Sequence, residues 1–122
     1  RISPDELHAL ITSGSAPVII DVRADSSRQM QPQRIPGAML YDMSSKDNAI
    51  EIDGPDREII IYCACPNEAS AVVLARTLMG RGFKRVRPLH GGIDAWVARG
   101  YGVEHVVAVT PAMLETAEAI GH

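Results

Sequence analysis

The stretch that decides the fold is IIIYCACPNEASAVVLA, residues 59–75. It opens on an apolar run that, together with Glu58, is typical of a buried strand. Further on, small and apolar residues recur with the spacing of one helix face, at Ala71, Leu74, Ala75 and Leu78. The sequence therefore predicts a strand over 58–62, a loop that begins at Cys63, and a helix that starts near Asn67 or Glu68.

Strand-like and helical patterns alternate along the rest of the chain. Further strands are predicted within residues 17–22, 35–42 and 83–89, and helices over 4–13, 91–100 and 111–120. The polar residues 23–34 show no clear period and are predicted as a loop with at most one helical turn. This alternation favours an α/β fold with a mainly parallel central sheet that helices cover on both faces. In such sheets ligands bind at the carboxyl ends of the strands, and Cys63 lies at one such end.

The composition is that of an ordinary globular chain. The 122 residues are 46% hydrophobic and 22% charged, with a net charge of −3, and this length fits a single domain. The lack of a basic excess argues against a nucleic-acid partner, and the apolar runs are too short to span a bilayer. Because the chain begins with Arg1 rather than Met, we expect it to be a piece of a longer protein.

The two cysteines, Cys63 and Cys65, are separated by one residue. A disulfide between them would close a very small, strained loop, so the pattern argues against a disulfide-stapled secreted domain and favours a reducing compartment. A zinc site would need two further ligands, and the four histidines are scattered without paired spacing. We therefore expect neither a metal nor an organic cofactor.

The predicted loop places Cys63 where an anion is favoured. The backbone N–H groups from Ala64 to Glu68 and the positive end of the helix dipole would surround its sulfur. Because the pKa of a cysteine falls at a helix N-terminus, Cys63 is a candidate nucleophile. The same spacing fits a small buried apolar residue equally well, since free cysteines often take that role.

Three further motifs accompany this segment: DVR at 21–23, RIPGA at 34–38 and PLHGGIDAW at 88–96. In this order and spacing, the four motifs resemble a rhodanese domain over a core of about residues 2–102, which leaves 103–122 as an extension with a short helix.

The resemblance implies a rhodanese-like three-layer α/β fold, with helices on both faces of the sheet, and the transfer of a sulfane sulfur. Thiosulfate or a persulfide would be the donor, and a thiol or cyanide the acceptor. Cys63 would carry the sulfur as a persulfide, and Asp21 and Arg23 would support its loop from below. The loop residues around the terminal sulfur would be Ala64, Cys65, Pro66, Asn67, Glu68 and Ala69, of which Pro66 has no backbone N–H.

The details of these motifs resemble the rhodanese domains that are fused behind DedA-type membrane proteins. RIPGA, YCACPNEAS and RVRPLHGGIDAW are similar to segments of those domains. This resemblance implies a cytoplasmic domain that is tethered to a membrane segment outside this chain. We expect a monomer whose partner is a small sulfur donor or a persulfide-bearing protein.

The loop departs from the family at Glu68, where many active rhodaneses carry an arginine. Phosphatases of related fold need an arginine one position later, where this chain has Ala69, so phosphatase activity is not expected. A carboxylate in the first turn of a helix, with Asn67 as the N-cap, would complement the helix dipole by about 0.3–1 kcal/mol. The same charge would repel an anionic donor and raise the pKa of Cys63. The hypothesis is that thiosulfate is a poor donor and that a persulfide is preferred.

Several other motif residues allow more than one interpretation. Gly91 and Gly92 would permit a tight turn and a close approach of the chain to the Cys63 loop. Trp96 is expected in the core. His90 is not assigned to catalysis, and Arg87 is a candidate for the positive charge that the loop lacks.

Cys65 leaves a second function open. It could resolve a persulfide or sulfenic acid on Cys63, or its side chain could pack under the loop as a small apolar group. The first expectation is a sulfurtransferase that uses Cys63. The alternative is a non-catalytic persulfide-sensing or redox-sensing module that uses the Cys63/Cys65 pair to regulate a membrane protein.

Overall fold

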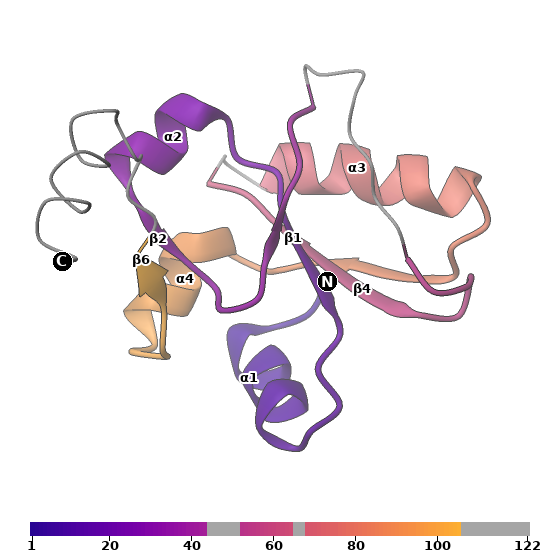
Figure 1. The fold of residues 1–122 in the computed structure, drawn as a ribbon, viewed down its shortest axis with the longest axis horizontal. Helices are drawn as coiled ribbons and strands as arrows, with labels where there is room; N and C mark the ends of the chain where they lie inside the picture. Colours follow the sequence, from indigo (N-terminus) through magenta and orange to yellow (C-terminus); the bar gives the residue numbers. More distant parts are fainter. Residues whose placement is uncertain (44–51, 65–67, 106–122) are drawn as a thin grey trace, which may run out of the picture.

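Four parallel strands form the central sheet of the computed structural model, which describes residues 1–43, 52–64 and 68–105 (Figure 1). Their order is β3-β1-β4-β5, and their bounds are Val18–Asp21 for β1, Met39–Leu40 for β3, Glu58–Tyr62 for β4 and Arg85–Pro88 for β5. Asp21 lies beside Tyr62, and Ile61 lies beside Pro88, so the carboxyl ends of β1, β4 and β5 lie together at one end of the sheet. The predicted parallel sheet is confirmed.

Helices cover both faces of this sheet. On one face Ile60 and Tyr62 pack with residues of α1 (Pro4–Thr12) and α4 (Gly92–Ala98). On the other, Ile59 and Ile61 pack against α3 (Ala69–Gly80), which lies opposite α1 across the sheet in Figure 1. Successive residues of β4 are thus buried on alternate faces, as expected for a central strand without a solvated side. The α/β fold with helices on both faces is confirmed.

Helix α1 begins where the sequence predicts. The Ser3 hydroxyl accepts a hydrogen bond from the Glu6 N–H at 3.1 Å, and the Glu6 side chain reaches back, so the capping box before α1 is present. The predicted stripe on α3 (Ala71, Leu74, Ala75 and Leu78) is buried. The predicted helix over 111–120 lies outside the described residues.

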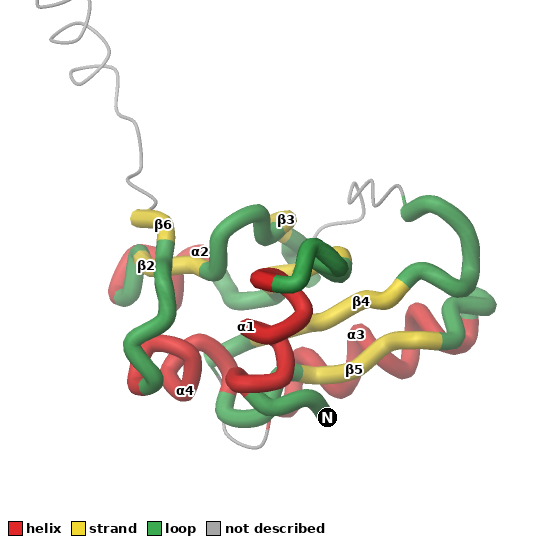
Figure 2. The backbone as a smooth tube through the Cα atoms, turned by 90° about the horizontal axis from the view of Figure 1, so that it is seen from below, coloured by secondary structure: helices red, strands yellow, loops and turns green. Residues whose placement is uncertain are grey.

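The region predicted as a loop contains two elements instead. Helix α2 spans Asp25–Met30, and strand β2, Gln33–Arg34, pairs antiparallel with β6, Glu104–His105. Both lie at the same end of the molecule as α4 (Figures 1 and 2). Helix α2 has no buried residue, so it carries none of the apolar periodicity from which a helix is predicted. Within the part of the chain that the structure describes, no helix is long and apolar enough to cross a membrane.

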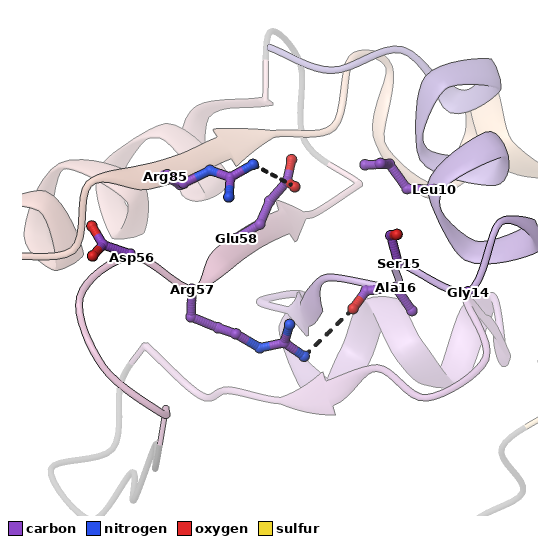
Figure 3. A pocket seen from close by; sticks show the side chains of 8 residues that line it. All are labelled: Leu10, Gly14, Ser15, Ala16, Asp56, Arg57, Glu58 and Arg85. Atoms are coloured by element: carbon purple, nitrogen blue, oxygen red, sulfur yellow. Dashed lines mark hydrogen bonds and ion pairs between the residues drawn. The ribbon is translucent and has the colours of Figure 1, made fainter.

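A polar pocket of about 700 Å³ lies at the opposite end of the sheet, where β4 and β5 begin (Figure 3). Arg85 reaches Glu58 there at 3.1 Å, and Arg57 donates to the Ala16 carbonyl at 3.4 Å. Glu58 and Arg85 are the first residues of their strands, so this pocket is at the amino ends of β4 and β5. Ligand sites of open parallel sheets form at the carboxyl ends, where Cys63 lies.

Candidate active site

Cys63 directly follows the last residue of β4 and is almost fully buried, with 2% of its surface exposed. It lies in the wall of a pocket of about 290 Å³ that is formed by the end of β1, by α2 and by the first turn of α3. The described lining residues are Val22, Arg23, Ala24, Ser27, Cys63, Ala64 and Ser70. Because α3 begins next to this pocket, the positive end of its dipole favours an anionic sulfur there.

The predicted loop residues fall into two groups. Ala64 lines the pocket beside Cys63, whereas Ala69 begins α3. Cys65, Pro66 and Asn67 lie outside the described residues. Their proposed role in cradling a terminal sulfur therefore stays a prediction.

Asp21 and Arg23 form a buried ion pair, and Arg23 also lines the pocket. Arg23 donates from Nε to Asp21 Oδ1 at 3.1 Å and from Nη2 to Asp21 Oδ2 at 2.8 Å. Arg23 is 3% exposed and Asp21 is 0% exposed. Nη1 and Nη2 of Arg23 also donate to the carbonyls of Gln31 and Gln33, at 2.8 and 2.9 Å. Each guanidinium nitrogen is thus engaged, and this cation ties β1 to the chain around β2.

Tyr62 belongs to the same network, although the sequence analysis did not single it out. Its hydroxyl donates to Asp21 Oδ2 at 3.0 Å and accepts from the Ile35 N–H at 3.3 Å. Burial, with the Asp21 charge beside it, raises the pKa of Tyr62 far above its usual value, so the hydroxyl stays protonated and keeps donating. The signal in the sequence was a phenol at the end of the strand, directly after three isoleucines.

Arg28 is a second residue that sequence reasoning missed. It pairs with Asp25 at 2.8 Å and donates from Nη2 to the carbonyls of Asp21 and Tyr41 at 3.2 and 3.3 Å. Since Tyr41 follows β3 and Asp21 ends β1, Arg28 fastens α2 to the ends of two strands. This contact holds the α2 wall of the pocket in place.

The first residues of α4 approach the backbone of Cys63, as predicted from the glycine pair. A Cβ atom at Gly92 would lie 2.1 Å from the Cys63 carbonyl oxygen, and Gly92 has a φ of +61°. The next residue, Ile93, donates its N–H to the same carbonyl at 3.2 Å. Only glycine combines the left-handed backbone with this approach, so Gly92 fixes where Cys63 sits relative to α4.

Replacing Gly92 by Ala is expected to lower the free energy of unfolding by about 2–3 kcal/mol, since the methyl group meets backbone rather than a movable side chain. Urea denaturation measures this change. Gly80→Ala is the matched control, because Gly80 is helical, has no positive φ and has open space around its Cβ position. An equal loss in both variants would contradict the close-approach argument.

Glu68 differs from its predicted role in the first helical turn. It precedes α3 with a left-handed backbone, φ +54°, and makes no side-chain capping bond. Its Oε1 instead accepts from the Gly91 N–H at 3.3 Å and lies 3.2 Å from Arg1 Nε and 3.4 Å from His90 Nδ1. The helix-dipole interpretation is therefore wrong, because the carboxylate points to the turn before α4.

Arg87 does not supply a positive charge to the loop. It pairs with Glu58 at the start of β4, as Arg85 does. Both arginine side chains of β5 are therefore directed to Glu58 at the amino end of β4, and Arg85 lines the polar pocket there. Trp96 is in the core as predicted, 2% exposed, and its Nε1 donates to the Gly102 carbonyl at 3.0 Å.

Over residues 1–43, 52–64 and 68–105, no cluster of three or more His, Cys, Asp or Glu side chains could hold a metal ion.

The chain is similar to proteins of known family. Residues 3–99 match the family described as Rhodanese-like domain. A thiosulfate sulfurtransferase, GlpE of Pseudomonas savastanoi pv. phaseolicola, is 30% identical over 98 residues, which are 80% of this chain and 87% of that protein. The adenylyltransferase and sulfurtransferase UBA4 of Candida albicans is 29% identical over 102 residues, and 79% of this chain covers only 23% of that protein.

The fold has solved counterparts as well. The crystal structure of the Alr3790 protein from Anabaena sp. superposes with a TM-score of 0.73 at 26% sequence identity and covers 97% of this chain and 93% of that one. The family match at residues 3–99 and this structural match span most of the described part of the chain. They agree with the parallel sheet, the buried cysteine after β4 and the glycine turn packed on that cysteine. The chain belongs to the rhodanese-like domain family.

Proposed function

We propose that this domain is a sulfurtransferase that carries a sulfane sulfur as a persulfide on Cys63. The observation that supports this function most directly is the position of Cys63. It lies at the carboxyl end of β4, in the wall of a small pocket and beside the first turn of α3. Relatives that bear the name thiosulfate sulfurtransferase support the same reaction class.

The reaction has two displacement steps. The Cys63 thiolate attacks the sulfane sulfur of the donor; a new S–S bond forms while the donor's own bond to that sulfur breaks, and the donor leaves as sulfite or as a thiolate. An acceptor thiolate or cyanide then attacks the outer sulfur of the Cys63 persulfide. The Cys63 thiolate leaves with its electron pair and is ready for the next donor.

A persulfide is the donor that best suits the described part of the pocket. Arg23 is the one cation among the described lining residues, its charge is paired with Asp21, and each of its three nitrogens already donates to Asp21 or to a backbone carbonyl. The other polar side chains in that lining are the neutral hydroxyls of Ser27 and Ser70. Thiosulfate is a dianion whose charge favours a charge-assisted hydrogen bond, whereas a persulfide donor needs less compensation at its reacting end.

Intact-mass spectrometry tests both the reaction and the donor. The domain is mixed with thiosulfate or with a cysteine persulfide, and peptide mapping locates the added sulfur. We expect one added sulfur on Cys63, and we expect it to form at least about tenfold faster from the persulfide than from thiosulfate. A factor of about ten is the rate difference that the loss of one charge-assisted hydrogen bond to thiosulfate would cause. Faster loading from thiosulfate would contradict the donor class, and no sulfur from either donor would contradict the sulfurtransferase.

A further inference from the structure

Both described ends of the Cys63 loop contact residues 90–93, which are the turn before α4 and the first two residues of that helix. At one end, the Cys63 carbonyl accepts from the Ile93 N–H and lies against Gly92. At the other end, the Glu68 carboxylate accepts from the Gly91 N–H. The turn before α4 is therefore held at neighbouring positions by the residue that starts the loop and by the residue that ends it.

The backbone conformation and the burial of Glu68 are both unfavourable for a glutamate, and no local preference explains why one stands here. It is the one non-glycine residue with positive φ in the described part of the chain, a conformation that disfavours a residue with a long side chain. It is also 7% exposed, and a buried carboxylate is unfavourable unless donors surround it. Glycine would satisfy the backbone better. The contacts of the carboxylate must therefore offset both costs.

Those contacts suit a carboxylate and no cation. One oxygen, Oε1, faces an N–H donor from Gly91, the guanidinium of Arg1 and the ring of His90. An arginine in place of Glu68 would meet the positive charge of Arg1 and the N–H of Gly91, neither of which can accept a hydrogen bond. The charge of Glu68 is directed to this cluster and not into the described lining of the Cys63 pocket.

We propose that Glu68 is a positioning residue that clamps the end of the Cys63 loop onto the turn before α4. Its role is to hold the backbone around Cys63 in the geometry that accepts sulfur, and it does not select the donor by charge. This inference rests on the proposed sulfurtransferase function for its kinetic consequence. The clamp itself is a property of the fold and can be measured without any sulfur donor.

The test compares Glu68→Ala, Glu68→Gln and Glu68→Arg in a Cys65→Ser background, so that Cys63 is the one thiol. Glu58→Gln is the matched control, because Glu58 is also a shielded carboxylate paired with two cations, but at the amino ends of the strands. Hydrogen exchange of the peptides that contain residues 68–72 and 89–94 reports the clamp. The loading rate of Cys63 at varied persulfide concentration reports its consequence.

We expect Glu68→Ala and Glu68→Arg to raise exchange in both peptides by about tenfold or more. The maximal loading rate should fall by about 10- to 100-fold, because a small misplacement of the reacting group costs that much, while the donor KM changes by less than about threefold. Glu68→Gln keeps an acceptor for the Gly91 N–H and should fall between Ala and the unmutated domain. Glu58→Gln should leave both readouts unchanged.

Three results would overturn the proposal. One is unaltered exchange in Glu68→Ala, and another is equal acceleration of exchange in Glu58→Gln. The third is a Glu68→Arg variant that gains thiosulfate activity at unreduced maximal rate, which would make Glu68 a donor-selecting charge. If the unmutated domain accepts no sulfur, the proposed function fails, yet the exchange measurement still decides whether the clamp exists.

Discussion

Replacing Cys63 by Ser or by Ala is expected to abolish sulfur uptake from every donor while the domain remains folded. A hydroxyl does not ionise at neutral pH and a methyl group cannot react, so neither side chain can attack a sulfane sulfur. Cys63→Ser places a hydroxyl in a site that is 2% exposed, at a cost of about 1–3 kcal/mol in the free energy of unfolding. Cys63→Ala avoids that cost, because cysteine packs there among apolar residues such as Ile61 and Ala71.

The measurement pairs the added mass with a thermal melt for each variant. Cys65→Ser is the control: it removes the neighbouring thiol, and uptake on Cys63 should continue. Sulfur that still binds covalently to Cys63→Ala would assign the carrier to another residue. Loss of uptake in Cys65→Ser, with Cys63 intact, would point instead to a reaction that needs both thiols, as the sensing module would.

The parts of the fold that the sequence could predict are those built on apolar periodicity. Strand β4 was predicted with its observed bounds because the run after Glu58 is buried on both faces, and α3 because its stripe faces the sheet. Gly92 was also interpretable, since a glycine pair before a helix indicates a backbone conformation or an approach that a Cβ would block. In each case one local rule carried the information.

The rest depended on contacts between residues far apart in the sequence. Helix α2 has no buried residue and its one apolar side chain, Met30, is exposed, so no periodic signal marks it; Arg28 fastens it to carbonyls at the ends of β1 and β3. The direction of the Glu68 side chain was likewise beyond sequence reasoning. The helix dipole favours a carboxylate in the first turn, but the partner groups on Arg1, Gly91 and His90 come from distant positions and override that preference.

The Asp21–Arg23 pair is expected to be the largest single contributor to stability among the site's side chains. Arg23→Met would leave the Asp21 carboxylate buried with only Arg28 at 3.7 Å and the Tyr62 hydroxyl as described side-chain partners. Breaking one side of a buried pair costs about 3–5 kcal/mol, a large share of the ~5–15 kcal/mol that holds a domain folded.

Urea denaturation of Arg23→Met, Asp21→Asn and the double variant tests this expectation, with Arg34→Met as the control. Arg34 pairs with Glu104 at 3.0 Å on the surface, where an ion pair contributes about 0–1 kcal/mol. The double variant should lose less than the sum of the single losses, because neither partner then leaves the other's full charge buried. Additive losses, or a loss in Arg23→Met no larger than in Arg34→Met, would mean that the pair does not hold β1 and the chain around β2 together. The pocket wall at Val22 and Arg23 would then need another support, and loading of Cys63 should survive the Arg23 substitution unchanged.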